Sequence, residues 1–153
     1  MALGSLDPGS EMRVLGIDVG ARRVGLAISD ATQTLARPLT TLSVNGRDDA
    51  VARVLIEIER RRAEEDGLSV IVVGLPLKLD GSTSEQTSRV AAFVEALTAR
   101  TSLPIVRMDE RLSSREAEGR LALHERDWRR RKTRLDAAAA AVILQDYLDR
   151  EGR

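Results

Sequence analysis

The run of residues 69–74, Ser-Val-Ile-Val-Val-Gly, is the feature that most narrowly limits what this chain can fold into. It is apolar without polar alternation and rich in β-branched residues, which is the pattern of a strand covered on both faces. We therefore predict an interior strand of a sheet that has helices on both sides.

Other runs predict the neighbouring strands. Residues 13–18 and 24–29 are short apolar runs joined by a tight, glycine-containing connection, which predicts two antiparallel strands. A third run, residues 36–42, contains Pro38. Because proline lacks an amide donor, this strand is predicted at an edge of the sheet. A last short strand is predicted at residues 105–108.

The first helix is predicted to begin at an N-cap, Asn45, with Asp48 three residues later, and to end at Gly67. Its buried face follows the helical repeat i, i+3, i+4, i+7, at Val51, Val54, Leu55 and Ile58.

Capping boxes predict the starts of later helices, because side chains three residues apart can bond reciprocally to the first turn. Ser82 and Glu85 form one such pair, and Thr133 and Asp136 form another. A further helix is predicted near Ser113. The last helix has a narrow face of small and apolar residues suited to close packing, namely Ala137, Ala140, Ala141, Leu144 and Leu148.

The predicted order of elements is β-β-β-α-β-α-β-α-α. Hairpins join antiparallel strands and helical crossovers join parallel ones, so we predict an α/β fold with a mixed five-stranded sheet flanked by helices. The 153 residues, 42% of them hydrophobic, suffice for one domain. We assign it to residues 12–153 and interpret residues 1–11, rich in Gly, Ser and Pro, as a cloning remnant.

Composition excludes several kinds of site. The chain has no Cys and one His, His124, which excludes disulfides and argues against a zinc site of the His/Cys kind. Any metal must then be held by oxygen atoms. Basic and acidic residues balance at 24 each, so overall charge does not indicate a partner. No run is long enough for a membrane helix and no secretory signal is visible, so we expect a cytoplasmic protein without membrane contact.

Three acidic positions are candidates for chemistry. Asp18 ends an apolar run, where a carboxylate loses hydration unless a partner, proton or metal replaces it; the alternative is a turn residue. Glu110, after Asp109, follows the last strand at the edge where α/β sheets bind ligands; the alternative is an acidic loop paired with Arg111. Asp136 stands at a predicted helix start, where the alternative is a capping role.

The three acids could share one chemistry. Mg²⁺ and Mn²⁺ prefer hard oxygen ligands, and Mg²⁺ commonly binds one or two carboxylates together with water and substrate phosphate. Two such ions about 4 Å apart can activate water and stabilise the leaving oxygen of a phosphodiester.

Residues 126–134 hold six basic residues and one acid, which is a pattern typical of contact with a phosphate backbone. Trp128 within this stretch either stacks on a base or anchors the segment to the core. We predict nucleic-acid contacts from the basic residues of this stretch and of the loops, namely Arg22, Arg23, Lys78, Arg111, Arg129, Arg130, Arg131 and Lys132.

Several motifs together resemble the YqgF/RuvX family over nearly all of residues 12–150. They are Gly16-Ile-Asp18-Val-Gly20-Ala-Arg-Arg23-Val-Gly25-Leu-Ala-Ile-Ser-Asp30, Val73-Gly-Leu-Pro76, Asp80-Gly-Ser82, Asp109-Glu-Arg-Leu-Ser113 and Leu135-Asp-Ala-Ala-Ala139. Members are described as Holliday junction resolvase-like proteins or as nucleases that mature the 5′ end of 16S ribosomal RNA.

The resemblance implies an RNase H-like fold and a site of Asp18, Glu110 and Asp136 that holds Mg²⁺ or Mn²⁺. The choice of Glu110 over Asp109 rests on the family pattern. One motif continues Leu-Ser-Ser where the family pattern has Leu-Ser-Thr, a change that keeps the hydroxyl.

Four functions are compatible with this pattern. The resemblance favours a metal-dependent nuclease that processes the 16S rRNA precursor, as a monomer or homodimer; branched DNA is the alternative substrate. A non-catalytic RNase H-like module that binds nucleic acid would leave the three acids unexplained. The run Gly-Ile-Asp-Val-Gly also resembles the phosphate-binding opening of actin-like kinases, but those proteins enclose nucleotide between two such domains.

Overall fold

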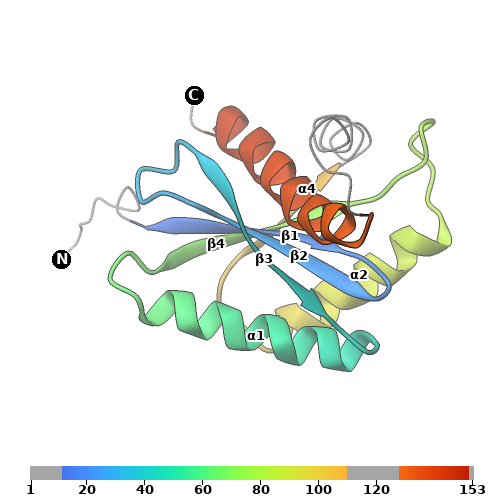
Figure 1. Ribbon diagram of the computed structural model, residues 1–153, viewed down its shortest axis with the longest axis horizontal. Helices are drawn as coiled ribbons and strands as arrows, with labels where there is room; N and C mark the ends of the chain where they lie inside the picture. Colours follow the sequence, from blue (N-terminus) through green and yellow to red (C-terminus); the bar gives the residue numbers. More distant parts are fainter. Residues whose placement is uncertain (1–11, 110–127, 152–153) are drawn as a thin grey trace.

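The computed structural model describes residues 12–109 and 128–151 (Figure 1). The strands are β1 (Arg13–Val19), β2 (Arg23–Ser29), β3 (Ala36–Ser43), β4 (Leu68–Leu75) and β5 (Ile105–Asp109). The helices are α1 (Arg47–Ala63), α2 (Glu85–Thr98) and α4 (Trp128–Glu151). The helix predicted near Ser113 and residues 1–11 lie outside the described part of the chain.

The strands form one five-stranded sheet in the order β3-β2-β1-β4-β5. The pairs β1–β2 and β2–β3 are antiparallel, whereas β1–β4 and β4–β5 are parallel. The predicted mixed sheet is therefore confirmed. Strand β4, which contains the run of residues 69–74, lies between β1 and β5, and β3 with its Pro38 lies at an edge, both as predicted.

Helices cover both faces of the sheet, with α1 and α2 on one side and α4 on the other (Figure 1). Side chains alternate along β1 accordingly. Leu15 and Ile17 pack into the core under α1 and α2, whereas Val14 packs into the core under α4. We call these two sides the α1/α2 face and the α4 face.

Helix α4 packs unusually close to the sheet, as its small residues predict. A β-carbon built on Gly16 would lie 2.8 Å from the Leu144 Cβ and 3.1 Å from the Ala140 carbonyl oxygen. Ala137, Ala140 and Leu144 are buried in this contact. The α4 backbone therefore lies directly on β1 and β2.

The predicted helix caps were wrong. Helix α1 has Gly46 as its N-cap, at φ 93°, with no side-chain cap. The predicted cap, Asn45, instead donates its backbone N–H to the Asp49 carboxylate at 2.8 Å. Asp49 thus satisfies a group just outside the helix, and the chain turns at glycine, which tolerates a positive φ.

The start of α2 differs for a similar reason. Its capping box is formed by Ser84 and Thr87. Ser82, predicted as the cap, donates both its backbone N–H and its hydroxyl to the Asp80 carboxylate, at 2.9 and 2.6 Å. An aspartate two residues before a serine can form a local turn of this kind, which leaves the serine outside the helix.

Helix α4 begins at Trp128, so Thr133 and Asp136 do not form the predicted capping box. The basic stretch from Arg129 to Lys132 lies inside this helix. Arg and Lys are good helix formers and extend the helix, although no apolar repeat marks them. None of the helices in the described part of the chain has the length and apolarity needed to cross a membrane.

Candidate active site

Asp18 lies within β1, next to its C-terminal end, and is partly buried. Its Cα is paired with that of Gly25 in β2. Residues directly opposite each other in an antiparallel pair have their side-chain directions on the same face of the sheet. The alternative that Asp18 is a turn residue is wrong, because it belongs to the strand ladder.

The surroundings of Gly25 show that this is the α4 face of the sheet. A β-carbon built on Gly25 would lie 2.0 Å from the carbonyl oxygen of Asp136 in α4. The direction of the Gly25 side chain therefore leads straight into the α4 backbone at Asp136. Because Asp18 shares that face, the fold brings Asp18 and Asp136 together at the same end of the sheet.

Asp136 is held by an arginine of the neighbouring strand. The Arg23 Nε donates to the Asp136 Oδ2 at 2.7 Å, and the two side chains are 30% and 26% exposed. Arg23 is two residues before Gly25 in β2, so it also faces α4. Asp136 stands about two turns inside α4, which starts at Trp128, so the alternative of a helix cap is wrong.

Asp109 is the last residue of β5 and is paired with Leu75. Leu75 and Ile105 pack against the core of the α1/α2 face, whereas Val106 and Met108 belong to the core of the α4 face. Strand alternation therefore assigns Asp109 to the face opposite Asp18. Glu110 and Arg111 lie outside the described residues.

The basic residues predicted to contact nucleic acid fall at two places. Arg22 is exposed between β1 and β2, and Lys78 is exposed between β4 and α2. Because β1 and β4 are parallel, both loops follow the carboxyl ends of their strands. They therefore lie at the same end of the sheet as Asp18 and Val19. Arg129, Arg130, Arg131 and Lys132 lie in α4, in the two turns before Asp136; their side chains lie outside the description.

The two described carboxylates suit a hard divalent cation, since their oxygens are the ligands that Mg²⁺ and Mn²⁺ prefer. The arginine cation already on Asp136 shows that this position accommodates positive charge. Residues 12–109 and 128–151 contain no cluster of three or more His, Cys, Asp or Glu side chains able to hold a metal. The third predicted ligand, Glu110, is outside those ranges.

Sequence reasoning missed the role of Gly25 and the pairing of Arg23 with Asp136. A signal for Gly25 was available, because an isolated glycine inside a strand often marks a site where another backbone approaches closely. No local pattern links Arg23 to Asp136, which are 113 residues apart.

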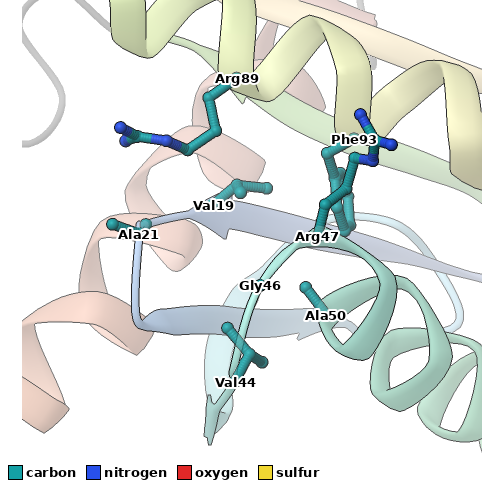
Figure 2. Close-up of a pocket in the computed structure, with 9 residues that line it drawn as sticks. Val19, Ala21, Val44, Gly46, Arg47, Ala50, Arg89 and Phe93 are labelled. Atoms are coloured by element: carbon teal, nitrogen blue, oxygen red, sulfur yellow. The ribbon is translucent and has the colours of Figure 1, made fainter.

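A cavity of about 190 Å³ opens on the other side of β1 (Figure 2). Its lining includes Val19 at the end of β1, Arg47 of α1, and Arg89 and Phe93 of α2. These elements belong to the α1/α2 face, so the cavity is separated by the sheet from Asp18 and Asp136.

Comparison with known proteins finds relatives that match this chain over most of its length. A protein of Maridesulfovibrio salexigens is 42% identical over 139 residues, covering 91% of this chain and 99% of that protein. One from Roseiflexus sp. is 39% identical over 145 residues, covering 95% and 97%. Both are named "Putative pre-16S rRNA nuclease".

Among solved structures, T. thermophilus RuvC in complex with Holliday junction substrate matches with a TM-score of 0.55 and 19% identity, over 92% of this chain and 97% of that chain. This likeness shows an RNase H-like fold, as predicted. A family model described as "RuvX: Holliday junction resolvase" matches residues 12–150. The chain therefore belongs to the RuvX family, which confirms the predicted resemblance.

Proposed function

We propose that this chain is a metal-dependent nuclease that hydrolyses phosphodiester bonds in the precursor of 16S ribosomal RNA. The observation that carries the proposal is the convergence of Asp18 and Asp136 on the α4 face, where Gly25 lets the helix backbone reach the strand. Two carboxylates beside the carboxyl end of a central strand in an RNase H-like sheet are suited to metal-assisted phosphodiester hydrolysis.

In this proposal Asp18, Asp136 and Glu110 hold Mg²⁺ or Mn²⁺, and Glu110 enters the set on the family motif alone. Metal bound there would lower the pKa of a water nucleophile and stabilise the leaving oxygen. The chain's own contribution is to fix the carboxylates: Asp18 on a central strand, and Asp136 on a helix pressed against the neighbouring strand.

The substrate assignment is supported by the names of the relatives, which describe nucleases of pre-16S rRNA. It is also supported by the basic residues around the site. Arg22 and Lys78 lie on loops at the same edge as Asp18, and the basic stretch of α4 leads into Asp136. Arg111 is included on its sequence position. Such residues would hold a phosphate backbone across the acids. Action on this RNA would place the protein in the cytoplasm.

The test is a cleavage assay with two labelled substrates, a 16S rRNA precursor that carries its 5′ extension and a four-way DNA junction. We expect cleavage of the precursor with Mg²⁺ or Mn²⁺ and none with EDTA. Cleavage of the junction alone would identify branched DNA as the substrate. Tight binding of RNA without cleavage under any metal condition would instead identify a binding module.

A further inference from the structure

The ion pair between Arg23 and Asp136 places a permanent positive charge inside the proposed metal site. The hydrogen bond joins the Arg23 Nε to a single carboxylate oxygen, the Asp136 Oδ2, at 2.7 Å. Arg23 reaches Asp136 from β2, from a position two residues before Gly25, which is the residue opposite Asp18. The guanidinium therefore lies on the face shared by both carboxylates.

The surroundings explain why a cation is useful here in the absence of metal. Asp18 and Asp136 converge, and two carboxylates brought together without a cation repel each other. A guanidinium on one of them reduces this repulsion and keeps the helix seated on the sheet. It carries one charge, half that of a divalent metal ion.

The exposure of the ion pair also allows Arg23 to dissociate from Asp136 and to bind it again. The two side chains of the pair are 30% and 26% exposed, so water and salt screen their attraction. A paired arginine with this much exposure contributes modestly to folding stability, so it can release Asp136 to a metal ion. A buried, fully bonded pair would not allow this exchange.

We propose that Arg23 is an internal counter-ion of the metal site: it neutralises Asp136 in the metal-free protein, and a divalent cation must compete with it. Arg23 is then a positioning residue that sets the metal affinity of the site. This inference rests on the proposed function, because it requires that Asp18 and Asp136 bind metal.

The expected size follows from Coulomb repulsion. A single positive charge roughly 5 Å from a divalent cation, in a medium close to water, weakens metal binding by roughly tenfold. Roughly three times farther away, the same charge changes the affinity by less than about twofold even at low salt. Removal of the Arg23 charge should therefore strengthen metal binding, whereas removal of a charge near the far end of β2 should matter little.

The experiment is a calorimetric titration of the metal-free full chain with Mn²⁺ and with Mg²⁺ at low salt. Arg23→Gln should bind metal roughly tenfold more tightly than the parent, and the gain should shrink at high salt. Arg23→Lys keeps the charge and should stay close to the parent. The matched control is Arg37→Gln, which removes the same charge from an exposed residue of β3 that pairs with Ile28, near the far end of β2, and should change the affinity less than about twofold.

Melting temperatures provide a second readout. Without metal, Arg23→Gln should melt below the parent, because the carboxylates lose their counter-ion. With saturating Mg²⁺ this difference should disappear or reverse. A residue with a merely structural role would lower the melting temperature equally in both conditions.

The outcomes separate this inference from the proposed function. Unchanged or weaker metal binding by Arg23→Gln, in a parent whose metal binding is lost in Asp18→Asn and Asp136→Asn, would overturn the role of Arg23 alone. A parent that binds neither metal, or whose binding survives both aspartate substitutions, would overturn the proposed metal site and this inference with it.

Discussion

Gly25 lies directly against the peptide of Asp136, so close that a β-carbon on Gly25 would come within 2.0 Å of the Asp136 carbonyl oxygen and 2.3 Å of its carbonyl carbon. The contact joins the strand opposite Asp18 to the helix that carries Asp136. The distance between the two candidate ligands thus depends on the absence of one methyl group.

Gly25→Ala should displace α4 and destabilise the fold by at least about 2 kcal/mol, since the clash is with backbone that cannot rotate away. Denaturant unfolding measures the loss. Gly67→Ala is the control: the nearest atoms lie 4.0 Å from its added β-carbon, so only its left-handed conformation, φ 57°, opposes the change, at about 1 kcal/mol. Equal losses in the two variants would contradict the close contact.

Asp18→Asn, Asp136→Asn and Glu110→Gln should each reduce metal-dependent cleavage of the precursor by about 100-fold or more, because each removes a charged oxygen ligand at nearly constant volume. Initial rates at saturating Mg²⁺ measure the effect. Asp109→Asn is the matched control on the opposite face and should retain activity. The reverse result, with Asp109 required and Glu110 dispensable, would exchange the two acids in the site.

Neutral replacement of Arg129, Arg130, Arg131 and Lys132 should weaken binding of all nucleic acids alike. Each lost phosphate contact should lower the log-log salt slope by about 0.9 on duplex DNA and about 0.7 on single strands. Filter binding over a salt series measures the slope. The double variant Arg60→Gln/Arg62→Gln, at the far end of α1, should leave it unchanged. A slope unaffected by the four substitutions would mean that the stretch makes no phosphate contacts.

Asp30 should stabilise the loop between β2 and β3 in a pH-dependent way. Slight desolvation of the exposed Asp30 carboxyl acts to raise its pKa, but hydrogen bonds from the Thr34 and Leu35 amides and the Thr32 hydroxyl outweigh this effect and hold the pKa below its ordinary value. A carboxyl with a lowered folded pKa contributes stability above its unfolded pKa, near 3.9, and loses this contribution as the pH falls through the folded value.

Asp30→Asn should therefore melt below the parent at pH 7, and the gap should narrow at pH 3, which is below the unfolded pKa. Thermal melts at the two pH values measure it. Glu65→Gln, at an exposed loop position, serves as the control and should show no gap at either pH. A gap that stays constant would mean that the Asp30 charge does not take part.

The strands could be predicted from sequence because each depends on a short local pattern. Pro38 identified an edge strand, and the uninterrupted run from Ser69 to Gly74 identified an interior one. The caps could not, because several polar side chains compete for the same amides and only the folded geometry decides between them. Asp80 captures Ser82, and Ser84 then caps α2.

The candidate site was predictable in its residue types rather than in its arrangement. The position of Asp18 at the end of an apolar run predicted a functional carboxylate there. Glu110 and Asp136 were selected by the family motifs. The salt bridge between Arg23 and Asp136 joins elements at opposite ends of the chain. Periodicity and capping report only on neighbours in sequence, so they could not reveal this contact.

The separation of 113 residues between Arg23 and Asp136 also orders events during synthesis. A nascent chain emerges from its N-terminus at about 5–20 residues per second, so β1 and β2 are exposed well before α4 has been made. Asp136 can reach Gly25 only after the segment through α4 has left the ribosome. A nascent chain whose α4 has not yet left the ribosome therefore has no assembled site, so any activity of this site can begin only after α4 has emerged.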